Sequence, residues 1–417
     1  MQGLLAALAT VLVSRPCSEA DIYAGWPLPK AKTIGASRPL PDLLREPNAP
    51  CSQIELVNID LNAAEALHLT RAVAFPENGE FRNLSALEGI KSVTLDGIPV
   101  GDAGASVLSA AFSTDIHGGQ NISISLASTG LTSTGAQAMA MALKATGSAL
   151  SALRLEWNEQ IGDAGAGAIG HALEANRVLG VLGLERCGVG DSGAIALATA
   201  LQKGAAVREL RLEGNAIGAL GTQALSAALI AGARLDHLGL ALNPVGAEGA
   251  VLLAEALHRD VALHTLDLSN CAIGDEGAVA LGHSLRGNTM LRKLILLGNG
   301  IGPRGVAALA DALRIKPALN TLNLRLNHLG ETAAAELLSA VKHAKSIAAG
   351  GESLTSLDLE YNTVVPTHGL HQPEPVSEHL LVELEGVLLM SSGSAASGAS
   401  PSEADAPTTI GTQSYVG

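Results

Sequence analysis

The sequence predicts an α/β solenoid, a horseshoe with a parallel β-sheet on its concave face and helices on its convex face. The first observation is a recurring phrase, L-x-x-L-x-L-x-x-N-x-I-G-x-x-G, which reads LDHLGLALNPVGAEG at 235–249 and LRKLILLGNGIGPRG at 291–305. The second is its period of 28 residues, set by the second leucine of L-x-L at Leu184, Leu212, Leu240, Leu268, Leu296 and Leu324. A fixed period of this length is typical of stacked repeats, in which each unit contacts only its neighbours.

The composition fits a long repeat core and limits the partners. Of the 417 residues, 47% are hydrophobic but only 2% are aromatic, so leucine, isoleucine, valine and alanine must fill the core. The net charge of −14 disfavours nucleic acid and anionic membranes, and no segment is apolar for long enough to span a bilayer. The four cysteines contain no CxxC pair, so a zinc or redox motif has no support. Cys187 and Cys271 lie about three units apart, too far to pair, which favours a reducing compartment.

Residues 1–53 form a proline-rich N-terminal extension that does not match the repeat. Within it, the apolar segment Leu4 to Val13 has the length of a signal-peptide core. No basic region precedes this segment and no A-x-A-like cleavage site follows it. We therefore expect a cytoplasmic protein and keep secretion as the alternative.

The solenoid is predicted over residues 54–375, with about eleven units. Its first strand is expected at 56–64, and the next unit, at 90–104, is already in register. The copies at 121–135, 150–165 and 179–193 are irregular, and regular units then continue to 319–333. The last copy, at 354–365, follows an insertion around 345–352 that lengthens the period to 35 residues.

Each unit reads as a strand, a turn and a helix. The leucines of L-x-L alternate with period two, which indicates a strand, and residues such as Val279, Leu281 and Leu285 then recur at helical spacing. Aspartates precede several of these helices, where a carboxylate can accept the free amides of the first helical turn: Asp102, Asp163, Asp191 and Asp275. A recurring glycine, Gly193 for example, is expected to let the helix and strand layers pack closely.

A fixed slot at the end of each strand holds a polar residue with a structural role. It is filled by Asn158, Asn215, Asn243, Asn299, Asn327 and Asn362. A buried amide there can bond to backbone groups of neighbouring turns, and a cysteine thiol at Cys187 or Cys271 can substitute for it. These residues are not expected to be catalytic.

The chain ends with two predicted segments. Residues 376–390 have the pattern of an amphipathic helix with Ser377 as its N-cap, and such a helix would cap the open end of the core. Residues 391–417 are rich in serine, alanine, glycine, proline and threonine, and are expected to be a disordered tail.

Units of 28 and 29 residues with asparagine or cysteine in one slot resemble the ribonuclease-inhibitor-like subfamily of leucine-rich repeats. The similarity covers about 90–365. The subfamily includes ribonuclease inhibitors, the repeat domains of NOD-like receptors and the Ran GTPase-activating protein. The resemblance implies a leucine-rich-repeat horseshoe, and related ribonuclease inhibitors bind their partner partly through concave aromatic residues.

Three columns of residues follow the repeat along the predicted concave face. They combine paired charges in the earlier units, apolar side chains in the middle units, and the two aromatic residues between 121 and 363. We predict a partner-binding surface of Arg154, Glu156, Trp157, Glu185, Arg186, Arg211, Glu213, Leu242, Ile295, Leu297, Leu326 and Tyr361.

Each group of this surface also has a purely structural interpretation. The charges could form a self-neutralising surface ladder, the aromatic rings could cover the end of the sheet, and the leucines could pack on one another across strands. Trp157→Ala combined with Leu297→Asp separates the interpretations, because it should weaken partner binding and leave thermal unfolding nearly unchanged.

No motif in the chain indicates catalysis. No Ser/His/Asp or Cys/His set falls on one column, and His368 with His371 lacks a third metal ligand. We therefore expect a non-catalytic, monomeric scaffold for a protein partner, without cofactor or metal. The alternative is a Ran-type GTPase-activating protein or another regulator of a small GTPase. The acidic run typical of that family is reduced here to Glu403 and Asp405, and an assay of GTP hydrolysis by Ran tests this alternative.

Overall fold

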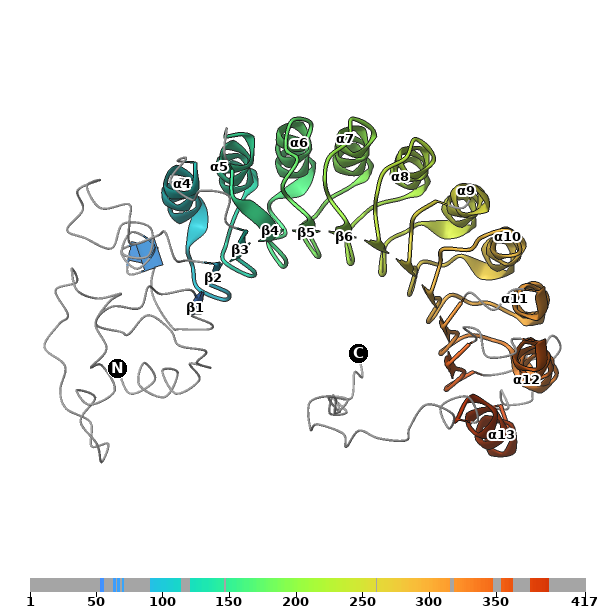
Figure 1. Ribbon diagram of the computed structural model, residues 1–417. Helices are drawn as coiled ribbons and strands as arrows, with labels where there is room; N and C mark the ends of the chain where they lie inside the picture. The colour runs from blue at the N-terminus through green and yellow to red at the C-terminus, as the bar shows by residue number, and fades with distance from the viewer. Residues whose placement is uncertain are drawn as a thin grey trace, which may run out of the picture.

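A computed structural model gives the architecture of the chain. It describes residues 53–55, 63–64, 66–67, 70, 91–113, 121–145, 148–259, 261–315, 319–347, 354–362 and 376–389. In these residues eleven strands form one parallel sheet in strict chain order, β1 to β11. The sheet lines the inside of a horseshoe and the helices form its outer layer (Figure 1). The predicted α/β horseshoe is therefore confirmed.

The strands are short, because each covers little more than one L-x-L segment. Their bounds are β1 Gln53–Glu55, β2 Ser92–Thr94, β3 Ile122–Ser125, β4 Leu150–Arg154, β5 Val181–Gly183, β6 Glu209–Arg211, β7 His237–Gly239, β8 Thr265–Asp267, β9 Lys293–Ile295, β10 Thr321–Asn323 and β11 Ser356–Asp358.

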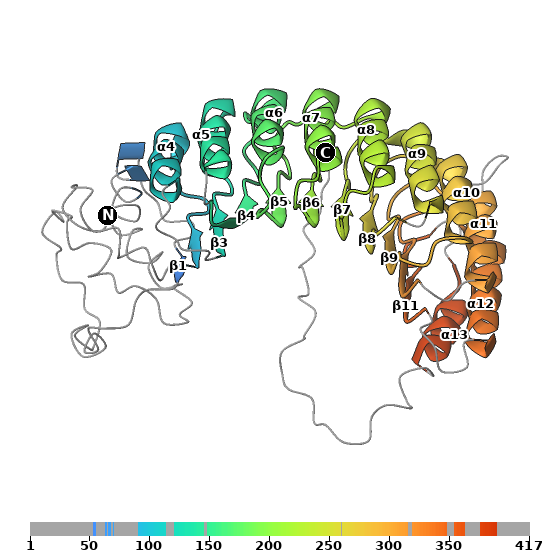
Figure 2. The same ribbon diagram turned by 45° about the horizontal axis from the view of Figure 1, so that its top comes forward.

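The helices of the outer layer follow the strands one by one and lie side by side (Figure 2). Their bounds are α4 Gly101–Phe112, α5 Ser133–Lys144, α6 Gly162–Leu173, α7 Asp191–Gln202, α8 Ala219–Ile230, α9 Gly246–His258, α10 Gly274–Leu285, α11 Pro303–Ile315, α12 Gly330–Ile347 and α13 Glu378–Leu389. Helices are about 10 Å wide and strands only about 5 Å apart, so the stack curves toward the sheet.

The repeat leucines build one continuous core between the two layers. Leu238 of β7 pairs with Leu266 of β8, and Leu266 pairs with Leu294 of β9, so equivalent leucines lie in register. All three are fully buried, as are the second leucines of L-x-L. The fixed period therefore places equivalent apolar side chains of successive units in register along the core.

The strand-end slot carries the hydrogen bonds that link consecutive turns, as predicted. Asn243 donates from Nδ2 to the carbonyls of Leu212 and Leu240, and its Oδ1 accepts the amide of Ile217. Cys187 and Cys271 occupy the same slot, and each thiol donates to the carbonyl of the preceding unit at 3.1 Å. Burial raises the pKa of both thiols to about 12, which keeps them protonated as donors.

The aspartates before the helices act differently from the prediction. Each caps the helix of the next unit rather than its own: Asp163 Oδ1 accepts the amides of Gly190 and Gly193 at the start of α7. Asp102, Asp191 and Asp275 make the same pair of bonds to the following unit.

The recurring glycine belongs to this inter-unit contact. A Cβ on Gly193 would lie 2.8 Å from Asp163 Oδ1 and 3.0 Å from the Cβ of Ala166 in α6. The missing side chain thus makes room for the previous unit's aspartate and helix, not for the strand layer as expected.

Two other expectations concern the ends of the solenoid. The first described strand is Gln53–Glu55, in register with β2 through the pair Ile54 and Val93, whereas residues 56–62 of the strand expected at 56–64 lie outside the described residues. At the start of the insertion expected around 345–352, α12 continues to Ile347 and has 18 residues, whereas α11 has 13.

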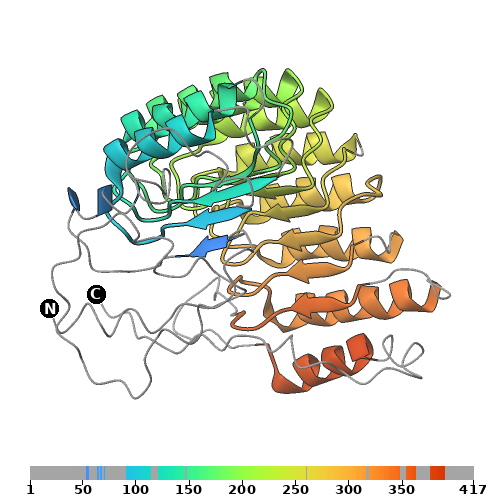
Figure 3. The same cartoon turned by 60° about the vertical axis from the view of Figure 1, so that its left-hand side comes forward.

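Helix α13 packs against α12 at the C-terminal end of the stack (Figure 3). Val376 and Leu384 are buried there. Lys345 of α12 donates to the carbonyls of Val387 and Leu388 at the end of α13, and Lys342 pairs with Glu383. Ser377 accepts the amide of Leu380 through Oγ at 3.5 Å, the contact of the predicted N-cap.

Four features expected from the sequence lie outside the described residues. They are the extension before Gln53, the apolar segment Leu4 to Val13 within it, the two histidines at 368 and 371, and the tail 391–417.

Candidate functional site

The three predicted columns occupy two different parts of the concave side. The residues inside L-x-L, such as Arg154 and Arg211, lie in the strands. The second and third columns lie in the tight turn that follows each strand, as do Glu185 and Arg186 after β5. The sequence prediction treated all three as strand positions, and the turn was missed.

The third column carries exposed residues with left-handed backbone conformation. Its large members, which we call the turn ridge, are Trp157, Arg186, Leu242, Leu326 and Tyr361, and the small polar residues Ser128 and Asn270 adopt the same conformation. Their φ angles lie between 50° and 61°. Glycine fills the equivalent position at Gly214 and Gly298, also with positive φ. Those two glycines were the sequence signal for a left-handed turn at this column.

An arginine from a neighbouring unit stacks on each aromatic residue of the ridge. The guanidinium of Arg186 lies 4.3 Å from the centroid of the Trp157 ring, and that of Arg325 lies 4.5 Å from the Tyr361 ring. Trp157 is nonetheless 56% exposed and Tyr361 63% exposed. The rings are therefore held in place on one side and open on the other.

The second column places three carboxyl groups on successive units, which we call the glutamate ladder: Glu156, Glu185 and Glu213. Each is half-buried because it lies against glycine. A Cβ on Gly183 would meet Glu156 Oε1 at 2.3 Å and Glu185 Oε2 at 3.0 Å, so two carboxyl groups converge on one point. Glu213 lies directly over Gly239 in the same way.

Burial is the main cause that raises the pKa of all three glutamates above the ordinary value. The effect is largest for Glu185, whose pKa rises to about 8, because the charges of Glu156 and Glu213 add to the desolvation. The Oε2 atom of each residue is buried and has no hydrogen-bond partner in the described part of the chain.

The predicted arginine partners neutralise this ladder only in part. Arg211 pairs with Glu209 and approaches Glu185 to 4.0 Å. Arg154 donates to the Ser123 hydroxyl at 3.2 Å, and Arg186 lies on Trp157. Among the described residues, no basic side chain lies within ion-pair distance of Glu156 or Glu213.

The apolar residues do not form the single central patch that was predicted. Leu242 and Leu326 stand exposed on the turn ridge, at 48% and 49%, whereas Ile295 and Leu297 are half-buried. The unit of β8 separates Leu242 from the other three with polar side chains, Asp267, Ser269 and Asn270. Ile295, Leu297 and Leu326 remain together on two consecutive units.

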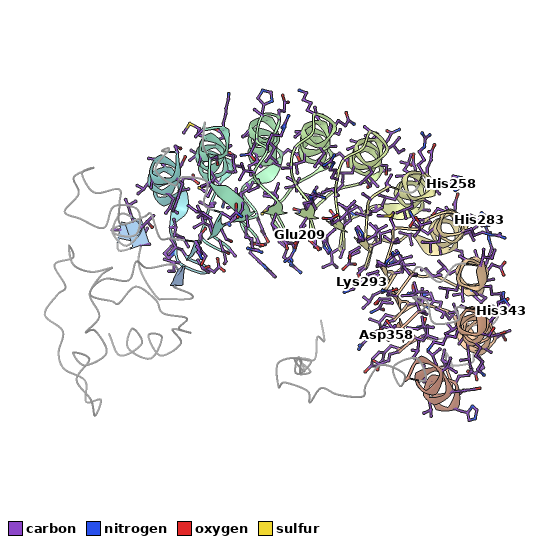
Figure 4. All side chains as sticks on the ribbon, viewed as in Figure 1. Glu209, His258, His283, Lys293, His343 and Asp358 are labelled. Carbon is purple, nitrogen blue, oxygen red and sulfur yellow. The ribbon has the colours of Figure 1, made fainter. Side chains whose placement is uncertain are left out.

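The concave face carries a fourth column of residues that the sequence prediction missed. It precedes the first leucine of L-x-L and contains Glu209, His237 and Lys293, paired in the sheet through Thr265. Glu209 and Lys293 point into the concavity together with Asp358, whereas His258, His283 and His343 lie on the outer helices (Figure 4). The period-two alternation of the strand was the signal that places this column on the concave face.

Nothing in the described residues assembles a metal site. No group of three or more His, Cys, Asp or Glu side chains in that part of the chain is arranged to hold a metal ion. No helix among those described is both long and apolar enough to cross a membrane.

Comparison with known proteins identifies the repeats. The family model described as "Leucine Rich repeat" matches residues 149–170, 175–198, 263–282 and 287–310. Together with the eleven-stranded parallel sheet backed by helices, this match defines an α/β leucine-rich repeat solenoid. No curated protein sequence matches the chain.

Solved structures that are similar to this chain differ widely in sequence. One, of the leiomodin-1 actin-binding site 2, is 20% identical with a TM-score of 0.28, and the match covers 34% of this chain and 72% of that one. One of a TLR13–ssRNA13 complex is 17% identical with a TM-score of 0.42, covering 68% and 34%. One of a yeast Rad7–Elc1 complex is 14% identical with a TM-score of 0.31, covering 72% and 83%.

Proposed function

We propose that this protein is a non-catalytic scaffold that binds a protein partner along its concave side, with the turn ridge as the main contact. The observation that carries the proposal is the choice of residues at left-handed positions. Trp157, Leu242, Leu326 and Tyr361 stand where Gly214 and Gly298 satisfy the same turn.

Large side chains are costly at these positions. A left-handed conformation costs a residue with a Cβ about 1 kcal/mol relative to glycine. These side chains are also largely exposed, so core packing does not offset that cost. Strained positions of this kind concentrate at functional sites, which supports a binding role for the ridge.

The two aromatic residues fit the role of interface anchors. Tryptophan, tyrosine and arginine are the residue types that most often dominate binding energy at protein interfaces. Arg186 on Trp157 and Arg325 on Tyr361 limit the motion of each ring, so little side-chain entropy is lost on binding.

The test uses a variant that removes contacts without straining the turn. Trp157→Gly combined with Leu326→Gly deletes two ridge side chains and leaves the residue type that the backbone prefers. Tagged full-length protein is used to capture partners from an extract of the source organism, with quantitative mass spectrometry. The double variant should lose captured protein tenfold or more, as expected for loss of an aromatic anchor.

A matched control removes equally exposed apolar side chains from the convex face. Met141→Ala combined with Leu220→Ala serves this purpose, since Leu220 is 64% exposed on α8. This control should capture the same proteins as the unmodified chain. Retention of every captured protein by the ridge variant, or their loss from the convex control instead, would contradict binding on the concave side.

A further inference from the structure

The glutamate ladder holds closely spaced carboxyl groups that the described basic side chains neutralise only in part. Glu156 and Glu185 converge over Gly183, and the neighbouring arginines are engaged with Glu209, Ser123 and the Trp157 ring. Three stacked carboxylates that ionise together repel one another unless a cation lies between them. The side chain of Glu185 keeps 18% of its surface exposed, so the ladder can be reached from the concavity.

We infer that the concave face accepts a protein segment that places an arginine side chain over Glu156, Glu185 and Glu213, with its neighbouring apolar residues against Trp157. This inference rests on the proposed function and adds the chemistry of the partner.

Charge and shape both favour a guanidinium group. Equivalent residues on adjacent strands are about 4.8 Å apart, a spacing that one planar guanidinium can bridge with donors to two carboxylates. The exposed face of Trp157 lies one residue from Glu156 and offers apolar contact to the same segment. The net charge of −14 further favours a basic ligand over an acidic one.

The experiment uses two synthetic peptides that differ only in charge, acetyl-Gly-Leu-Arg-Leu-Gly-amide and the same peptide with citrulline in place of arginine. Citrulline keeps the shape of arginine without its charge. The full chain carrying Trp26→Phe leaves Trp157 as its only tryptophan, so the fluorescence of Trp157 reports binding. We expect the arginine peptide to bind at least tenfold more tightly than the citrulline peptide.

The dependence on the ladder is measured with Glu156→Gln, Glu185→Gln and Glu213→Gln combined. This triple variant should bind the two peptides equally, whereas Glu360→Gln, in the same column at β11, should keep the preference for arginine. For the unmodified ladder, binding of arginine should also tighten between pH 7 and 9. Ionisation of Glu185, which faces Glu156, Glu213 and Arg211, favours the cation. Within the same ladder, Glu156 faces Asp96, Arg154 and Arg211, and Glu213 faces Asp267, Arg211 and Glu156.

The outcomes separate this inference from the proposed function. Equal binding of the two peptides at millimolar concentration, or a preference that survives in the triple glutamine variant, overturns the arginine site. If the ridge variant still loses its captured partner in that case, the proposed function stands without this chemistry. An arginine preference that depends on the ladder while the ridge variant keeps every partner supports the site and refutes the ridge as main contact.

Discussion

At the scale of single residues, the concave surface is shaped by where glycine is used and where it is not. Gly183 and Gly239 leave hollows in the sheet, and Glu156 and Glu213 fill them. The carboxyl groups therefore lie against the strands and are partly removed from water, which raises their pKa. A sequence column of three glutamates suggests a charged patch, but the neighbouring glycines turn it into a half-buried one.

The first prediction concerns Glu185, whose raised pKa makes stability depend on pH. The folded protein holds the proton up to about pH 8, whereas an unfolded glutamate releases it near its ordinary value of 4.5. Stability should therefore fall as pH rises across this window. Glu185→Gln removes the penalty, so the variant should be more stable at pH 9 by on the order of 2 kcal/mol. The gain should disappear toward pH 5.

Urea unfolding followed at several pH values checks this prediction. Glu360→Gln is the matched control, because Glu360 occupies the same column but is exposed and pairs with Arg325 at 3.2 Å. The control should change stability by less than about 0.5 kcal/mol at every pH. A pH-independent effect of Glu185→Gln would show that its carboxyl group is ionised normally.

The second prediction contrasts two leucines of one turn. Leu242 is exposed with a φ of 58°, and Leu240 is fully buried. Leu242→Gly should leave stability unchanged or raise it by up to about 1 kcal/mol, because glycine relieves the left-handed strain. Leu240→Ala should cost about 3 kcal/mol through the cavity it leaves. Thermal unfolding of the two variants measures both effects, and a large loss from Leu242→Gly would mean that the side chain packs in the fold.

At the scale of helices and strands, the helix of a unit is capped by an aspartate from the preceding unit. Asp191 lies in the first turn of α7 but caps α8, through the amides of Gly218 and Gly221 at 2.8 Å. A carboxylate on two free amides of a helix N-terminus satisfies donors that the helix itself cannot satisfy. Neighbouring helices are thus joined by polar bonds as well as by core packing.

The third prediction tests this cap between units. Asp191→Ala should destabilise the protein by about 1–2 kcal/mol, the usual cost of a lost N-cap. Hydrogen exchange should rise at the start of α8 rather than at the start of α7, because the bonds belong to the next unit. Asp311→Ala is the control, since Asp311 is 60% exposed and pairs only locally with Arg314. Increased exchange confined to α7 would contradict capping across units.

Features within a unit, and the bonds that the asparagine slot makes to neighbouring turns, could be predicted from the sequence, whereas the other contacts between units could not. Leu238 and Leu240 in L-x-L, the asparagine slot at Asn243 and the helical spacing all follow from one unit's own periodicity. The destination of the Asp191 carboxylate and the position of Glu213 over Gly239 depend on how adjacent units are offset. A residue's column was visible in the sequence, but the direction of its side chain was not.

At the scale of the whole molecule, a line of side-chain amides and thiols runs along the strand ends. From Asn158 to Asn362, members of this line bond to backbone groups of the preceding unit, and Cys187 and Cys271 continue it. Stability of such a stack is the sum of unit stabilities and nearest-neighbour contacts. Removal of a structural element at one end should therefore lower the stability of the nearby units first.

The fourth prediction follows from this nearest-neighbour character. A chain ending at residue 375 lacks α13, and with it the buried Leu384 and the contacts that Lys342 and Lys345 make to that helix. Hydrogen exchange should increase in β10, β11 and α12 while β4 to β6 remain protected. Uniform loss of protection across the whole sheet would instead indicate a single cooperative unit.

The bonded line of turns also has a consequence for the size of a ligand. The rings of Trp157 and Tyr361 lie after β4 and β11, seven strand spacings apart, or roughly 34 Å along the sheet. Because each turn is bonded to the previous one, this separation is set by the fold. The solenoid therefore holds the two rings at a fixed separation. Only a ligand about as wide as a small folded domain contacts both rings at once, and a single loop contacts one of them.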